Sequence, residues 1–437
     1  MAYSKMDKPA TLFIFVQKVN QRLVYTANEF FKRRMGVDFE IVTNETAFES
    51  FDGFKLNYSS AEIEGIPSIV PASLLFEKRI HSQELDAFSD DGVLKLFQLK
   101  HNSLGYDPLA ASFFFLSRYE EYLLHRKDEH DRFLADEFLV VKEKAECSPL
   151  VEIYVQEVAE WLMETYSGFK PDFGKPRVEI TIDVDQVFAL KSKGLARSIL
   201  ASLSDLLRGK LLARLRVMFG LEKDPNDVYD HLISICEKAN VNLQLFIQVG
   251  GNSRFDVNNP PHLAAIKQRI TELSLSAKVG LHPSYYSSDD DKVLLNEMER
   301  LRNILAQPIK ASRQHYLRFR IPNTFRQLDE MGVKEDYSFG FTDRNGFRAS
   351  TCKPFRFYDL QREEVLEIKM IPIATMDLVS TRVHHDQDLA LKEMKAIWES
   401  VSKVGGLMVT MWHPEVLNGL EGEFASFSLL EDFLKDV

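Results

Sequence analysis

Residues 177–186 read Arg177-Val-Glu-Ile-Thr-Ile-Asp-Val-Asp-Gln186, and this stretch organises the second half of the chain. Its β-branched apolar residues alternate with polar ones, which is typical of a β-strand. Asp183 and Asp185 stand at the carboxyl end of that strand and, being two residues apart, point to the same face. Two carboxylates in one site repel each other unless a cation or a proton separates them. The alternative is an acidic turn exposed to solvent.

After this strand the chain alternates between strand patterns and helix patterns. Strand patterns cover 243–249, 278–281, 309–317, 366–373 and 407–412. Helix patterns cover 224–238, 260–275, 290–305, 323–331 and 386–404. Such alternation predicts a parallel sheet or a β/α barrel. In those folds the functional site lies at the carboxyl ends of the strands.

The length of 437 residues exceeds what one ordinary core accommodates, so we expect two domains. Residues 168–176 are rich in proline and glycine, and we place the boundary there, with a smaller α/β domain at 1–172 and the larger one at 173–437. In the first domain, 12–16 and 39–42 have strand patterns, and an apolar helix is predicted over 107–123.

Composition excludes some classes of function. The net charge of -11 argues against general nucleic-acid binding, which requires basic surface. The chain has no pattern of a signal peptide or of a membrane-spanning segment. Its three cysteines, Cys147, Cys236 and Cys352, are too widely spaced for a disulfide framework or a zinc knuckle. We therefore expect a cytoplasmic protein.

Histidines at strand ends complete a candidate metal site. Asp185, His282 and His315 offer one carboxylate and two imidazoles, which are sufficient ligands for a divalent ion, with Zn²⁺ the first expectation. The alternative for each histidine is a structural role, which is the commoner one for a lone histidine. His384 and His385 lie in a polar stretch and are interpreted as surface residues.

Three further residues supply candidate proton chemistry. Asp183 can accept a proton from an attacking water, and His413, which follows the strand at 407–412, can donate one to the leaving group. Arg313 lies two residues before His315 and could hold Asp183 ionised and oriented. This set predicts a metal-dependent hydrolase.

Five short motifs carry a resemblance to a known family. They are Thr181-Ile-Asp-Val-Asp185, Gly280-Leu-His-Pro-Ser284, Ser312-Arg-Gln-His315, Asp336-Tyr-Ser338 and Trp412-His-Pro414. In this order they resemble the motifs of polysaccharide deacetylases (NodB homology, carbohydrate esterase family 4). The resemblance implies a distorted β/α barrel, metal-dependent removal of an acetyl group, and the roles given above to Asp183, Asp185, His282 and His413. The leading part resembles an amino-terminal domain that is often joined to such modules in bacterial surface-polysaccharide gene sets.

The chain departs from the family pattern in two places. The second motif of the family has another histidine four residues after the first, and that position is Tyr286 here. His315 is therefore expected to replace it as a ligand. The glycine-punctuated loop 340–350 also differs, and we expect Arg348 in this loop, together with Tyr286, to bind substrate.

These observations favour a cytoplasmic metal-dependent deacetylase acting on an acetylated sugar or polysaccharide precursor. Two alternatives stay open. One is another metal-assisted hydrolase of C–N bonds on the same fold. The other is an inactive protein that binds glycans or serves as a scaffold, which the missing histidine of the second motif would explain.

A helical insertion, 191–225, follows the first strand of the second domain. Its basic residues are Lys191, Lys193, Arg197, Arg208, Lys210, Arg214, Arg216 and Lys223. They indicate an anionic partner, either a membrane surface or the phosphate of a lipid-linked glycan. The alternative is that the apolar face of this helix docks onto the rest of the protein.

Overall fold

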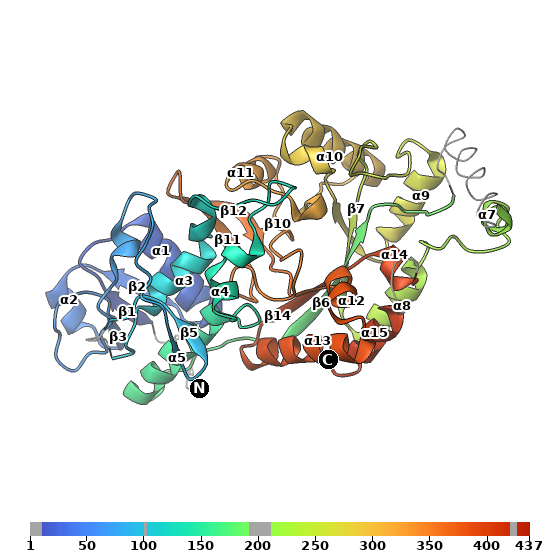
Figure 1. The fold of residues 1–437 in the computed structure, drawn as a ribbon. Coiled ribbons are helices and arrows are strands. Elements are labelled where there is room, and N and C mark those ends of the chain that lie inside the picture. The colour runs from blue at the N-terminus through green and yellow to red at the C-terminus, as the bar shows by residue number, and fades with distance from the viewer. Residues whose placement is uncertain (1–10, 100–102, 192–210, 420–425) are drawn as a thin grey trace, which may run out of the picture.

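The computed structural model describes residues 11–99, 103–191, 211–419 and 426–437. Its smaller sheet has the parallel order β2-β1-β3 and lies at one end of an elongated molecule (Figure 1). The strands are β1 (Leu12–Phe15), β2 (Phe39–Val42) and β3 (Phe54–Asn57). A two-stranded ribbon of β4 (Phe88–Asp90) and β5 (Val93–Lys95) accompanies it.

The larger sheet has nine strands in the order β11-β12-β10-β9-β8-β7-β6-β14-β13. They are β6 (Arg177–Val184), β7 (Asn242–Ile247), β8 (Lys278–Leu281), β9 (Ala311–Ser312), β10 (Glu335–Asp336), β11 (Phe355–Asp359), β12 (Glu364–Met370), β13 (Thr375–Met376) and β14 (Leu407–Trp412). All neighbours are parallel except β11 and β12. The end strands β11 and β13 do not pair with each other, so closure into the expected barrel is not confirmed.

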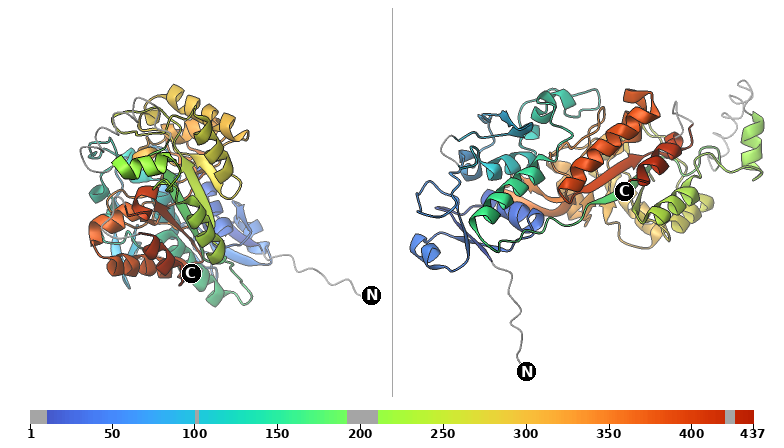
Figure 2. Two further views of the ribbon diagram at one scale, coloured as in Figure 1. Left: turned by 90° about the vertical axis from the view of Figure 1, so that its right-hand side faces the viewer. Right: turned by 90° about the horizontal axis from the view of Figure 1, so that it is seen from below.

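Helices cover both parts of the molecule (Figure 2). In the amino-terminal part they are α1 (Gln21–Ala27), continued by a π-helical segment (Asn28–Arg34), α2 (Glu45–Ser50), α3 (Pro108–Leu116), α4 (Leu139–Lys142) and α5 (Leu150–Thr165). In the larger part they are α7 (Leu211–Met218), α8 (Tyr229–Ala239), α9 (Ala264–Leu273), α10 (Asp291–Leu305), α11 (Asn323–Glu330), α12 (Asp377–His384), α13 (Gln387–Lys403), α14 (Pro414–Leu417) and α15 (Ser426–Leu434). Contacts of α8 with β7, α10 with β8 and α13 with β14 place these helices against the sheet.

The two parts share one hydrophobic core. The β11–β12 hairpin packs on the amino-terminal helices, with Tyr358 4.9 Å from Tyr25 and 5.2 Å from Phe113 between ring centroids. Beside these rings, the buried Arg22 donates hydrogen bonds to Glu363. The core continues across the predicted boundary between residues 172 and 173, so the division into two domains stays a prediction.

Several predicted elements are confirmed, and others end earlier than expected. The strand patterns at 12–16, 39–42, 278–281 and 407–412 form β1, β2, β8 and β14. The helix predicted over 107–123 ends at Leu116, because Arg118 adopts a left-handed conformation with φ 56°. Strand β11 and helix α12 were not predicted.

Among the described residues, no helix is both long enough and apolar enough to span a bilayer.

Candidate active site

Three strands of the large sheet bring acidic and basic side chains to one edge. Asp183 is on β6, and His282 and His413 directly follow β8 and β14, so the carboxyl ends of parallel strands gather them. Gly280 permits the close packing of β8, since a Cβ there would lie 2.7 Å from the carbonyl of Ala311 and 2.8 Å from the ring of Phe246.

His315 reaches the same edge from a turn. The strand predicted over 309–317 is confirmed only at β9 (Ala311–Ser312), and Tyr316 and Leu317 have φ values of 60° and 49°. Left-handed conformations at two successive residues cannot continue a strand. The turn directs His315 toward His282, with 5.0 Å between their ring centroids.

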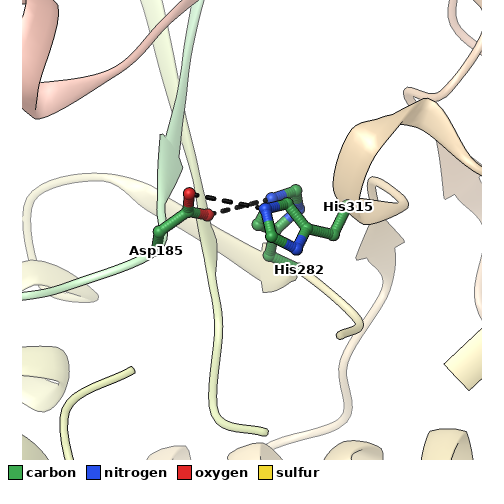
Figure 3. Close-up of side chains that lie close together, drawn as sticks. All are labelled: Asp185, His282 and His315. Atoms are coloured by element: carbon green, nitrogen blue, oxygen red, sulfur yellow. Dashed lines mark ion pairs between the residues drawn. The ribbon is translucent and has the colours of Figure 1, made fainter. Parts of the chain in front are cut away.

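Asp185, His282 and His315 converge, and their potential ligand atoms all lie within 4.8 Å of one another (Figure 3). Nε2 of His282 is 3.3 Å from Oδ1 of Asp185, and Nε2 of His315 is 3.5 Å from Oδ2. Oδ1 of Asp185 is buried and accepts no hydrogen bond from a described residue. A buried carboxylate oxygen facing imidazole nitrogens is a donor set suited to a divalent cation.

Further hydrogen bonds fix both imidazole rings. Nδ1 of His282 donates to the main-chain carbonyl of Arg313 at 2.6 Å, and Nδ1 of His315 lies 2.9 Å from Oδ1 of the buried Asp256. With Nδ1 engaged in this way, Nε2 of each ring is directed to Asp185. Such outer partners orient histidine ligands in metal sites, so these residues fit a bound divalent ion.

The carboxylates around His315 favour a positive charge between them. Burial opposes the charged form of His315, but Asp185 and Asp256 raise its pKa to about 10. Burial likewise opposes ionisation of Asp185, yet His315 and His282 hold the pKa of this carboxyl well below its usual range. Two ionised carboxylates around one imidazole would attract a cation as they attract a proton.

Asp183 lies beside this group and is held by a buried arginine. Nη1 of Arg313 donates to Oδ1 of Asp183 at 2.7 Å, and its Nη2 donates to the hydroxyl of Thr181 at 2.6 Å. Oδ2 of Asp183 lies 3.7 Å from Nε2 of His282. One oxygen is therefore fixed by Arg313, and the other faces the candidate ligands.

His413 is held on the opposite side by Asp377 at the start of α12. Nδ1 of His413 lies 2.8 Å from Oδ1 of Asp377, and its main-chain N–H donates to Oδ2 at 2.7 Å. Burial opposes protonation, but Asp377, assisted by Asp183 and Asp185, raises the pKa of His413 to about 10. His413 therefore carries a proton at neutral pH.

Four of these residues line one cavity of about 560 Å³, whereas the buried His282 does not line it. Asp183, Asp185, His315 and His413 line it, and Met376, Leu378 and Met411 form an apolar wall. A second wall comes from the amino-terminal part through Glu129, His130 and Arg132. A mostly polar centre with one apolar wall suits a small acyl group on a polar substrate.

Two residues expected to bind substrate do not line this cavity. Arg348 is buried, and its guanidinium donates to both carboxylate oxygens of Glu121, at 2.6 and 3.2 Å. Tyr286 is 44% exposed and packs near Phe255, which does line the cavity. Substrate binding by Arg348 and Tyr286 therefore stays a prediction.

Several residues in or next to the candidate site were missed from the sequence. Asp256 and Asp377 each stand alone in a loop or at a helix start, without a strand pattern that would mark them. Glu415 also lines the cavity, and burial together with Asp185 raises its pKa to about 7. Only the Trp412-His-Pro414 motif next to Glu415 drew attention to that place in the chain.

The amino-terminal region matches a known family. Residues 12–167 match the family of unknown function DUF7033. None of the curated proteins matches the chain. The match covers β1 to α5, and because the function of this family is unknown, it indicates no activity.

Several solved structures are similar to part of the chain at low sequence identity. A Mycobacterium smegmatis protein provisionally named as a polysaccharide deacetylase is 16% identical, with 61% of this chain and 85% of that chain covered and a TM-score of 0.41. A polysaccharide deacetylase from Bacillus cereus is 11% identical, with coverages of 60% and 87% and a TM-score of 0.31. A pseudoenzyme of carbohydrate esterase family 4 from Bacillus anthracis is 12% identical, with 60% of each chain covered and a TM-score of 0.32. Similarities this low do not transfer an activity.

Proposed function

We propose that the protein is a metal-dependent hydrolase that removes acetyl groups from an acetylated sugar or polysaccharide precursor. The convergence of Asp185, His282 and His315 within 4.8 Å, next to a cavity lined by Asp183, Asp185, His315 and His413, carries this proposal. A bound divalent ion, Zn²⁺ by the nitrogen and oxygen character of the ligands, would supply Lewis acidity that polarises a carbonyl and lowers the pKa of water.

The residues around the ligands divide the proton transfers between them. Asp183, with Oδ1 fixed by Arg313, accepts the proton of the attacking water at Oδ2. His413, with Nδ1 held by Asp377, donates its Nε2 proton to the departing nitrogen or oxygen. Arg313 holds Asp183 in position through its hydrogen bond to Oδ1, and the raised pKa of His413 keeps the acid charged before the reaction.

The apolar wall favours acetyl over larger acyl groups. Met376, Leu378 and Met411 lie on the side of the cavity that also holds His413. A methyl group packed there would place its carbonyl toward the candidate ligands, where the developing negative charge is stabilised.

Metal content and acetate release together test the proposal. The purified protein should bind about one divalent ion, and Asp185→Ala, His282→Ala and His315→Ala should each lose it while the unfolding transition is retained. His384→Ala is the matched control, because His384 pairs with Glu393 on helix α13, away from the candidate ligands. Full metal occupancy in His315→Ala would remove His315 from the ligand set.

Substrate panels then separate this activity from its alternatives. Acetate release from N- or O-acetylated sugars supports the proposal. Hydrolysis of non-sugar amides alone would indicate another C–N hydrolase, and glycan binding without turnover in the metal-loaded protein would indicate an inactive binding protein.

Contact with an anionic membrane or a lipid-linked glycan stays a prediction. Four of the eight basic residues of the insertion lie at 192–210, outside the described residues. In the described part, Arg214 is buried and Arg216 pairs with Glu222 at 3.0 Å. Leu212, Phe219 and Leu221 are exposed, so docking onto the described chain does not account for their apolar surface. Salt-sensitive binding to anionic vesicles would support this contact.

A further inference from the structure

The segment 127–133 of the amino-terminal part reaches into the candidate active site. His130 and Arg132 line the same cavity as His315. The segment is held by its own hydrogen bonds, since Oδ1 of Asp128 accepts from the main-chain N–H groups of both His130 and Arg132 at 2.9 Å. It therefore forms a fixed wall and not a loose loop beside the site.

This segment is bonded to the turn that carries His315. Nη1 of Arg132 donates to the carbonyl of Tyr316 at 2.6 Å, and Nε of Arg318 donates to the carbonyl of His130 at 2.8 Å. Tyr316 has a left-handed conformation, with φ 60° and ψ 12°, which is unfavourable for a residue with a large side chain. The bond from Arg132 stabilises this conformation and so fixes the ring of Tyr316 beside His315.

The result is a group of aromatic rings next to the candidate ligands. The ring centroid of Tyr316 lies 4.6 Å from that of His315, 4.9 Å from that of His130 and 6.0 Å from that of Phe255. Tyr316 is 37% exposed, and its hydroxyl makes no hydrogen bond with any described residue. His130, Phe255 and Tyr316 all line the cavity.

We propose that His130, Phe255 and Tyr316 form a subsite for the pyranose ring that carries the acetyl group, with His130 supplied by the amino-terminal part. This rests on the proposed function for the acetyl group but extends it to the recognition of the sugar. The C–H bonds on one side of a pyranose form an apolar face that packs against the negative face of an aromatic ring. Because the ring of Tyr316 packs against that of His315, a pyranose on Tyr316 would lie next to the candidate ligands.

The polar groups of the wall agree with a sugar ligand. Nδ1 of His130 is 3.0 Å from the hydroxyl of Tyr285, which fixes the imidazole plane. Burial and the neighbouring Arg132 lower the pKa of His130, so the ring is neutral at pH 7 and is easily desolvated by a bound sugar. The hydroxyl of Tyr316 can bond to a sugar hydroxyl.

Matched variants test the subsite by binding. The measurement is calorimetric affinity for N-acetylated hexosamine oligosaccharides in the turnover-deficient, metal-loaded Asp183→Asn background. His130→Ala removes one ring, and Tyr316→Asn removes another while keeping a residue that tolerates left-handed φ. We expect each to raise Kd about tenfold, which is the upper range for one aromatic contact. His130→Phe keeps the ring and should restore most of the affinity.

His125→Ala is the control, two residues before this segment. Its ring packs on Phe133, with 4.2 Å between centroids, and does not line this cavity. It should leave Kd within about twofold, and all variants should keep the unfolding temperature of their parent. In the catalytically competent background, hydrolysis of a small acetyl ester without a sugar ring should change little in His125→Ala.

The outcomes separate this subsite from the proposed function. Equal affinities in all variants, an equal loss in His125→Ala, or no oligosaccharide binding at all would overturn the subsite. Acetate release from sugars by the unaltered protein with Kd independent of His130 would retain the deacetylase and reject the subsite. Affinity that depends on His130 and Tyr316 without acetate release from any sugar would retain the subsite and reject the deacetylase.

Discussion

Arg313 and Arg348 are both buried, and each binds one carboxylate across a long sequence separation. Arg313 pairs with Asp183 at 2.7 Å and also lies over the ring of Phe246. Arg348 pairs with Glu121 at 2.6 Å and lies over the ring of Phe319. The chemistry of the two pairs is thus nearly the same, but only one of them borders the candidate ligands.

The difference lies in the second oxygen of each carboxylate. Arg348 and Arg118 engage both oxygens of Glu121, and although burial opposes ionisation they lower its pKa. Oδ2 of Asp183 instead faces His282. A buried arginine–carboxylate pair is therefore no mark of a site by itself, and a carboxylate with one oxygen left toward a cavity is the more informative feature.

The largest expected effect is on turnover. Asp183→Asn should lower kcat by about 10²–10⁴-fold, because an amide cannot accept the proton of water. Metal content should be unchanged, since Asp185, His282 and His315 are intact. Glu121→Gln is the comparison variant. Its folded fraction should have the kcat of the unaltered protein. A kcat within tenfold of the unaltered protein would exclude Asp183 as the base.

The second effect is on stability and concerns the other pair. Arg348→Met should lower the free energy of unfolding by about 3 kcal/mol, the low end for loss of one partner of a buried pair, because Glu121 keeps Arg118. Urea unfolding measures it. Arg344→Met in the same loop is the control, since its pairs with Asp136 and Asp343 are at the surface and should contribute less than about 1 kcal/mol. An equal change in the free energy of unfolding of both variants would show that the buried pair of Arg348 and Glu121 contributes no more than a surface pair.

The sequence predicted the parts of the site that follow strands. Asp183, Asp185, His282 and His413 stand at the ends of well-patterned strands, so the parallel sheet brings them together. His315 was predicted at the correct edge for an incorrect reason, because a turn and not a strand carries it there. Asp256 and Asp377 act through long-range hydrogen bonds that no local pattern encodes. The pairing of Arg348 with Glu121, which is 227 residues away in the chain, was likewise not predicted, and substrate binding by Arg348 stays a prediction.

The third effect is on the pH dependence of the reaction. His413 acts in its protonated form, and its pKa is raised to about 10, so kcat/KM should fall only as the pH rises through that value. Asp377→Asn removes the charge that raises this pKa most and should move the basic limb toward neutrality. If the pKa of His413 falls to about 9 or below, kcat/KM is compared at one pH above about 10. There it should drop about tenfold for each unit by which the pKa has fallen. The profile of kcat/KM against pH measures it, and an unmoved basic limb would assign that limb to another group.

The same pair contributes to stability with a defined sign. The pKa of His413 in the folded protein lies above its unfolded value of about 6.5. Its contribution is therefore fully present below that unfolded value and is lost as the pH rises through about 10. Asp377→Asn should reduce this dependence, which unfolding measured across that range would detect.

The smallest expected effect is at Tyr286, which occupies the position of the second histidine of the family motif. Its side chain is 44% exposed and lies outside the residues that line the cavity. His315 already offers a second imidazole to Asp185, so the site does not depend on this position for a ligand. Tyr286→Ala should change KM and kcat less than about twofold and the free energy of unfolding by less than about 0.5 kcal/mol. Tyr286→His should likewise leave the metal stoichiometry unchanged, whereas a second bound ion or a large gain in metal affinity would show that this position still faces the site.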